Sequence, residues 1–101
     1  MEDRNEMPPE MRLRKPGQGE TLAIVESMLG TNKVKIMCQD GKERIGRIPG
    51  KLRKRIWMRE GDVVIIKPWD IQGEKFANIS YRYNPTEASI LRRKGILKIS
   101  L

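Results

Sequence analysis

One stretch of the chain, residues 42–59, carries nearly all of its surplus charge. It holds eight basic residues and one acidic residue, a net charge of +7, whereas the whole 101-residue chain carries +8. Such a concentration of cations is typical of a surface that binds a polyanion, and the commonest polyanion in a cell is nucleic acid. The alternative is a solvated face that only keeps the protein soluble, but solubility requires no clustering. The basic residues of this stretch are Lys42, Arg44, Arg47, Lys51, Arg53, Lys54, Arg55 and Arg59.

The residue types of this chain argue against catalysis and against metal binding. The chain has no histidine and one cysteine, which removes the commonest general base and excludes an ordinary zinc site. Cys38 alternates with Val34 and Ile36, so we interpret it as a core thiol rather than a nucleophile. Residues 46–51 differ from a phosphate-binding loop because their glycines are one residue too close and Leu52 replaces the Ser or Thr. We therefore predict no catalytic residue, no metal site and no cofactor.

Aromatic residues indicate which kind of nucleic acid fits. Single-strand readers stack bases on aromatic side chains, and the second and third expected strands, at 33–38 and 43–48, contain none. We expect Trp57 and Tyr81 in the core. Trp69 lies in a connection before the last strand and is a candidate for stacking on a base. The pattern therefore favours recognition of the grooves and backbone of structured RNA over a single strand.

Length and composition place the protein in a broad class. A chain of 101 residues corresponds to one domain. One cysteine allows no internal disulfide and fits a reducing compartment. No apolar run approaches the length of about 18 residues that spans a membrane, and the acidic start MEDRNEMPPE lacks the apolar region of a signal peptide. We expect a cytoplasmic protein without membrane association, acting as a monomer.

The elements that position the basic residues can be predicted from periodicity and turn signals. Residues 1–19 lack apolar periodicity and contain several Pro and Gly, which predicts a flexible tail. Strands are expected over 21–29, 33–38, 43–48, 63–68 and 76–83, with a hairpin turn at Asp40-Gly41. The run 63–68 opens with four consecutive apolar residues, VVII, and suits a strand buried on both faces. Gly46, inside the third strand, predicts a bulge or bend that would bring both Arg44 and Arg47 to the surface.

Five short strands with an insert after the third predict a small closed barrel. Pro49-Gly50 ends the third strand, and residues 51–58 are expected to form a short helix or helical turn with Leu52 and Ile56 on one face. This layout is that of an all-β, five-stranded OB-fold barrel of the S1-like type. An SH3-like barrel is the main competitor, and the helical insert favours the OB-fold. The expected division is a tail at 1–19, a barrel at 20–83 and a C-terminal helix with a short extension at 84–101.

The C-terminal helix has clear start and stop signals. Asn84 is suited to the N-cap, Pro85 to the first helical position and Glu87 to a capping box. Basic residues at 92–94 suit the negative end of the helix, and Gly95 is the expected stop.

Several blocks of this chain resemble a known family, translation initiation factor 1A, the archaeal and eukaryotic relative of bacterial initiation factor 1. The resemblance runs from Glu20 to Gly95. Its most specific part is the block IPGKLRKRIW at residues 48–57. Other matching blocks are VESMLG at 25–30, CQDGK at 38–42, REGD at 59–62, PWD at 68–70 and LRRKG at 91–95. The long acidic C-terminal tail of eukaryotic members does not follow Leu101, which indicates the archaeal type.

This resemblance implies a function and partners. Members of the family bind the A site of the small ribosomal subunit, against the decoding helix of its RNA, and help to recruit initiator tRNA and mRNA. The implied partners are the small-subunit RNA, the initiator tRNA complex and other initiation factors, including a translational GTPase. The resemblance places RNA contacts at Lys51, Arg53, Lys54 and Arg55, with Arg44 and Arg47 adjacent. The alternative is a general RNA-binding OB-fold protein such as an RNA chaperone.

Overall fold

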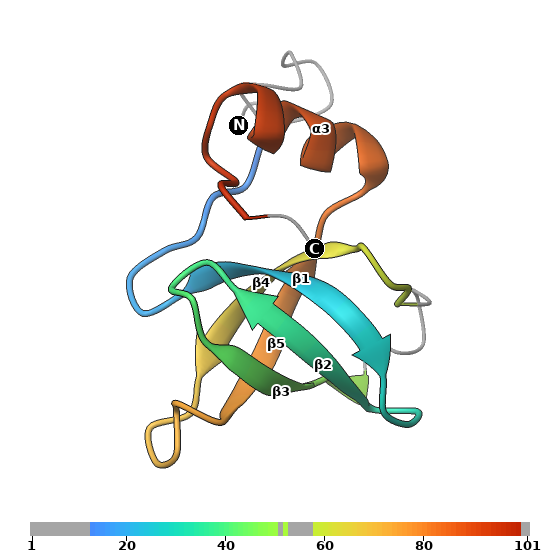
Figure 1. Ribbon diagram of the computed structural model, residues 1–101, viewed down its shortest axis with the longest axis vertical. Helices are drawn as coiled ribbons and strands as arrows, with labels where there is room; N and C mark the ends of the chain where they lie inside the picture. The colour runs from blue at the N-terminus through green and yellow to red at the C-terminus, as the bar shows by residue number, and fades with distance from the viewer. Residues whose placement is uncertain (1–12, 51, 53–57, 100–101) are drawn as a thin grey trace, which may run out of the picture.

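A computed structural model of the protein describes residues 13–50, 52 and 58–99 (Figure 1). The strands are β1 (Thr21–Met28), β2 (Lys33–Cys38), β3 (Glu43–Arg47), β4 (Val63–Pro68) and β5 (Phe76–Arg82), and helix α3 (Pro85–Arg93) follows them. They close into a barrel in the order β1-β2-β3-β5-β4, in which β3 and β5 run parallel and β4 returns to β1. This is the five-stranded barrel of the OB-fold, followed by the expected C-terminal helix. The helical insert expected at 51–58 lies largely outside the described residues.

The core consists of two apolar clusters that share strand β4. Val64 and Ile66 belong to the cluster inside the barrel, whereas Val63 and Ile65 belong to a second cluster beneath α3. All four residues are at most 2% exposed, so the prediction of a strand buried on both faces is confirmed for residues 63–66, whereas Lys67 is exposed. The second cluster joins the helix to the outward-facing side chains of β1 and β4. Helix α3 therefore covers the outer face of these two strands (Figure 1).

The segment that precedes β1 differs from the sequence-based expectation. Leu13 is 7% exposed and packs in the second cluster. The hydroxyl of Tyr83 donates a hydrogen bond to the carbonyl oxygen of Arg14, and the Arg14 guanidinium lies 5.2 Å from the centroid of the Tyr81 ring. The expectation that residues 1–19 form a tail without core contacts is therefore wrong for residues 13 and 14. Residues 1–12 lie outside the described part of the chain.

The turn and capping signals act as predicted. Gly41 adopts φ of +88° after Asp40, and Gly95 adopts +75° after α3. The Asn84 side chain accepts a hydrogen bond from the Glu87 backbone at 2.7 Å, and the Glu87 carboxylate accepts one from the Asn84 backbone at 2.9 Å. Beyond the helix, the Gln39 side chain bonds to the backbone of Ile96 and of Lys98, which fastens the extension to the barrel.

The third strand is more regular than expected. The β2–β3 register runs without a shift from Lys33↔Arg47 to Met37↔Glu43. The bulge predicted at Gly46 is therefore wrong. A methyl group at Gly46 would lie 3.2 Å from Cδ1 of Ile36 and 3.3 Å from Cδ1 of Ile79. Glycine makes room for the barrel interior at this point rather than interrupting the strand.

Candidate nucleic-acid interface

A row of exposed polar residues crosses four strands on the outer face of the barrel. Lys33 is opposite Arg47, Arg47 is opposite Asn78, and Asn78 is opposite Lys67, on β2, β3, β5 and β4 respectively. All four side chains are exposed. Neighbouring strands lie about 4.8 Å apart, so the row spans only about 15 Å. We call Lys33, Arg47 and Lys67 the cationic row.

No described carboxylate forms an ion pair with any member of the cationic row. Lys35, only two residues from Lys33 along β2, is different because its ammonium lies 3.4 Å from Glu43 and 4.0 Å from Glu26. Like charges directly opposite on paired strands destabilise a sheet, and Lys33 faces Arg47 across the β2–β3 ladder. A row that is uncompensated in this way is suited to an anionic ligand that supplies the missing charge.

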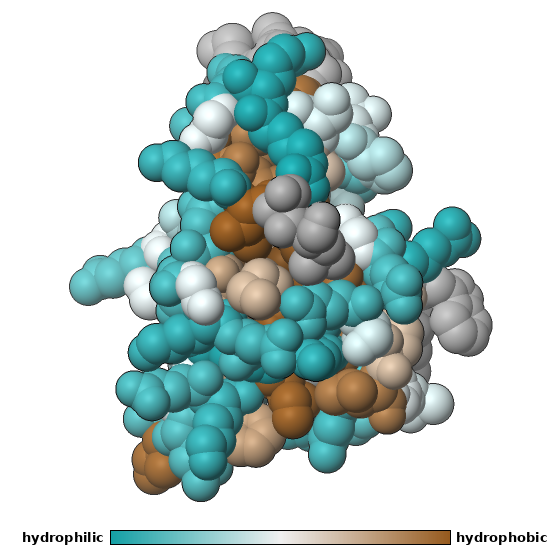
Figure 2. Space-filling view, in the orientation of Figure 1, coloured by the Kyte–Doolittle hydropathy of each residue, from teal (hydrophilic) through white to brown (hydrophobic). Residues whose placement is uncertain are grey.

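An apolar and aromatic row lies beside the cationic row. Ile45 is opposite Phe76, and each is two residues from a member of the first row along its strand, a spacing of about 6.6 Å. Leu29, Ile45 and Phe76 line a shared pocket of about 340 Å³. Figure 2 shows apolar atoms gathered along the lower edge of the molecule, in the region of the β1–β2 and β4–β5 loops. These strands and loops are the surface on which OB-folds bind oligonucleotides.

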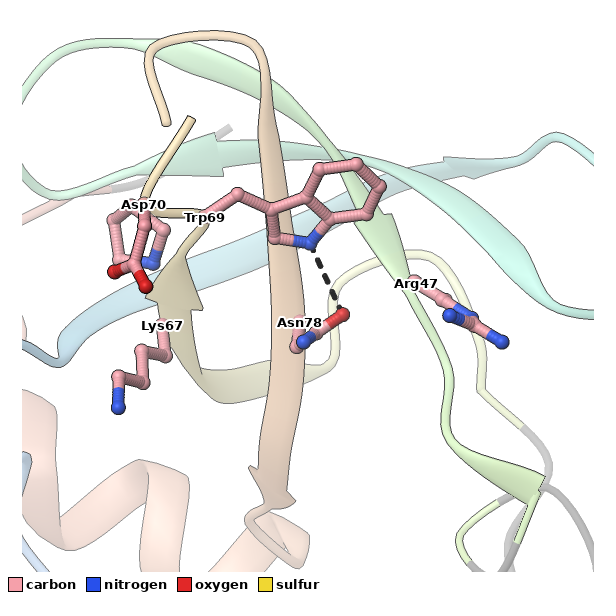
Figure 3. Close-up of a pocket in the computed structure, with 6 residues that line it drawn as sticks. Arg47, Lys67, Trp69, Asp70 and Asn78 are labelled. Carbon is pink, nitrogen blue, oxygen red and sulfur yellow. Dashed lines mark hydrogen bonds between the residues drawn. The ribbon is translucent and has the colours of Figure 1, made fainter. Parts of the chain in front are cut away.

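Trp69 connects the two rows. Its ring stacks on Phe76 with 5.0 Å between centroids, and its Nε1 donates a hydrogen bond to Oδ1 of Asn78 at 3.1 Å. Figure 3 shows the indole above Asn78, with Arg47 and Lys67 on either side of that amide. Arg47, Lys67, Trp69 and Asn78 all line a pocket of about 310 Å³. The side chain is 38% exposed, so an aromatic face is available beside cations, which is the combination that single-strand binders use.

The predicted site residues separate into different environments. Arg47 and Trp69 lie together on the outer face, as described above. Arg44 is 5% exposed and its guanidinium donates to both carboxylate oxygens of Asp40, at 3.0 and 2.8 Å. The expectation that a bulge brings Arg44 to the surface beside Arg47 is therefore wrong.

The remaining predicted residues are distributed differently. Lys42 is paired with Glu74 at 3.5 Å. Arg59 is exposed, and its backbone N–H donates to Asp62 at 2.8 Å. The basic block Lys51, Arg53, Lys54 and Arg55 lies outside the described residues, as does Trp57.

Hydrogen bonds and burial shift the pKa values of several groups near the site. The hydrogen bonds from Arg44 hold the pKa of Asp40 below its ordinary value, and Asp40 raises the pKa of Arg44. A hydrogen bond with Glu43 raises the pKa of Glu26. Burial raises the pKa of the Cys38 thiol, which is 0% exposed, so the prediction of a core thiol is confirmed. The charged form is therefore favoured for the Asp40–Arg44 pair.

The described residues contain neither a cluster of metal ligands nor a helix that could span a membrane. In the parts of the chain that the structure describes, no three His, Cys, Asp or Glu side chains are grouped as metal ligands. Within the same residues, no helix is both long enough and apolar enough to cross a bilayer.

Sequence reasoning missed Lys33, Lys67, Asn78 and Phe76 as members of this face. Their alternation along the strands is visible in the sequence. Lys33 is brought opposite Arg47 by the β2–β3 hairpin. Asn78 and Phe76, and through Asn78 also Lys67, join this face by the parallel pairing of β3 with β5, a long-range contact that leaves no local signal.

Comparisons with known proteins converge on one family. The family model described as Translation initiation factor 1A / IF-1 matches residues 9–100. The relative named Translation initiation factor 1A from Methanothermobacter thermautotrophicus is 53% identical, over 87% of this chain and 89% of its own length. The relative of the same name from Haloarcula marismortui is 54% identical, over 82% and 86% of the two chains. Among solved structures, YjeQ from Thermotoga maritima has a TM-score of 0.53 at 21% identity, covering 64% of this chain and 23% of that one, a likeness of fold alone.

Proposed function

Because the chain belongs to the translation initiation factor 1A family, we propose that it binds the A site of the small ribosomal subunit through contacts with the subunit's RNA. In this role it promotes the recruitment of initiator tRNA and mRNA. The observation that carries the proposal from this chain's own residues is the cationic row, which no described carboxylate neutralises. Ribosomal RNA supplies phosphates that would neutralise it.

In this proposal, two basic surfaces contact different parts of the RNA. The basic block at residues 51–55 contacts the backbone of the decoding helix. The cationic row, with Trp69 beside it, contacts a neighbouring RNA segment whose bases are accessible. Phosphate contacts position a protein on nucleic acid, whereas stacked bases add affinity where the strand is open. The protein works as a monomer beside the initiator tRNA complex and other initiation factors, one of them a GTPase, and it catalyses no reaction.

Chemical footprinting of the small subunit tests this assignment. We expect the wild-type protein to protect the decoding helix. The triple variant Arg53→Ala/Lys54→Ala/Arg55→Ala should lose that protection and keep its thermal unfolding transition, since lysine and arginine side chains seldom belong to a protein core. Protection of another region of the subunit by the wild-type protein, or full protection by the folded triple variant, would refute the assigned surface.

A second candidate function is general binding of single-stranded RNA, as in an RNA chaperone. The stack of Trp69 on Phe76 at a ring distance of 5.0 Å favours it. A titration with small subunits and with a 12-nucleotide oligouridine separates the two functions. An initiation factor should bind the subunit much more tightly than the oligonucleotide at the same salt concentration, whereas a chaperone should bind both comparably.

A further inference from the structure

Arg44 connects two loops that are far apart in the sequence. Its Nη1 and Nη2 donate to Asp40 in the β2–β3 turn, and its Nε donates to the carbonyl oxygen of Gly73 in the β4–β5 loop at 2.6 Å. The side chain is 4% exposed. All three bonds leave one planar group in a fixed fork, which lysine cannot reproduce. Arg44 thus fastens the β4–β5 loop to the barrel.

The fastened loop is the one that carries Trp69. Gly73 is so close to Trp69 that a methyl group on it would lie 2.3 Å from the Trp69 carbonyl oxygen. Gln72 adopts φ of +62°, a conformation rarely found for residues other than glycine. The loop is a tight turn, closed by backbone hydrogen bonds from Lys75 and Phe76 to Gln72 and from Trp69 to Phe76. Displacement of Gly73 would move the Trp69 backbone directly.

We propose that Arg44 is a positioning residue, which holds the β4–β5 loop so that Trp69 stays stacked on Phe76 at the edge of the binding face. The Asp40 carboxylate orients the guanidinium and balances its charge. The consequence for RNA affinity rests on the proposed function, but the position of Trp69 does not. The bridge also explains why an arginine in the basic segment is turned away from solvent.

Stability alone is a weak explanation for this arrangement. Replacing a buried ion pair by apolar side chains of similar volume is often neutral or stabilising. An exposed ion pair, between Lys42 and Glu74 at 3.5 Å, already joins the same two loops. Glu74 is 84% exposed, so Glu74→Gln provides a matched control that removes the exposed connection and leaves Arg44 in place.

The first test follows the indole of Trp69 directly. In a Trp57→Phe background Trp69 is the only tryptophan. Arg44→Met should increase acrylamide quenching by about twofold, because Trp69 is only 38% exposed in the fold and its indole gains solvent contact when it leaves Phe76. Glu74→Gln should leave the quenching unchanged. If Arg44→Met does not fold, as judged by thermal unfolding, Arg44→Lys takes its place, with the same expected direction.

The second test is a double-mutant cycle on binding to purified small ribosomal subunits, with a fluorophore at the protein's amino terminus. Trp69→Ala should weaken binding about fivefold or more, as expected for one stacked base. Arg44→Met should weaken it similarly, and the double variant should lose little more, because both changes remove the same contact. The proposal would be overturned if the loss of affinity in the double variant equalled the product of the two single losses. Unchanged quenching in a folded Arg44 variant would overturn it as well. If Trp69→Ala binds as wild type, the RNA contact in the proposed function is wrong, and the quenching result alone decides the role of Arg44.

Discussion

Neutralising the cationic row should change the salt dependence of RNA binding without harming the fold. The perturbation is the triple variant Lys33→Gln/Arg47→Gln/Lys67→Gln, which removes three charges that no described carboxylate pairs with. Each phosphate contact contributes about 0.7 to 0.9 to the slope of log affinity against log salt concentration. If all three side chains contact phosphates, the slope should become shallower by about 2 to 3.

We expect the same triple variant to be slightly more stable than the wild-type protein, although it binds RNA more weakly. Lys33 and Arg47 are directly opposite in the β2–β3 ladder, and removing such a like-charge pair should raise the free energy of unfolding by about 0.2–1 kcal/mol. Urea unfolding measures this change. A variant that binds RNA more weakly while it is equally or more stable would show that the row serves the ligand and not the fold.

A matched control lies on the same face. The double variant Lys35→Gln/Glu43→Gln removes an ion pair of 3.4 Å and leaves the net charge unchanged. Its salt slope should equal that of the wild-type protein. Titration of labelled protein with small subunits between 50 mM and 300 mM salt gives all three slopes. The reasoning is refuted if the triple variant keeps the wild-type slope, or if the control changes it as much.

Three further predictions concern the fold. Leu13→Ala should destabilise by about 2–4 kcal/mol in urea unfolding because the side chain is 7% exposed, and a wild-type midpoint would show that residue 13 adds nothing to the core. Asn84→Ala should cost about 1 kcal/mol through loss of the capping box with Glu87, while a cost near zero would contradict the observed cap. Arg44 lowers the pKa of Asp40 below its ordinary value of 3.8, so the stability that this carboxylate adds is present above pH 3.8 and is lost as pH falls through the lowered value. Acid unfolding should therefore be less pH-dependent below pH 3.8 in Asp40→Asn, and curves of equal steepness would contradict this linkage.

Local signals in the sequence were sufficient to predict most of the strands and the C-terminal helix. The alternation of Val34, Ile36 and Cys38 predicted β2 with its observed bounds, because a half-buried strand must place every second residue inside. The capping box at Asn84 predicted the start of α3, because the helix needs acceptors for its first backbone N–H groups. In each case the determining contacts lie within a few residues along the chain.

The site required contacts that the sequence does not reveal. The cationic row extends from β3 to Lys67 on β4 because β3 pairs in parallel with β5, which brings Arg47 beside Asn78. Leu13 was missed because one apolar residue has no periodicity. Arg44 was assigned to the RNA surface from its charge, whereas its burial depends on Asp40 and on the Gly73 carbonyl oxygen. Charge in a sequence therefore predicts that a binding surface exists more reliably than it predicts which cations belong to it.

Competition with tRNA tests the central claim most directly. Labelled protein is titrated into small subunits that carry tRNA in the P site alone, or in both the P and A sites. A factor that occupies the decoding region should bind the first kind of subunit as it binds empty ones, and should lose binding when the A site is filled. Undiminished binding to subunits with a filled A site would contradict the account, and would place this protein elsewhere on the ribosome.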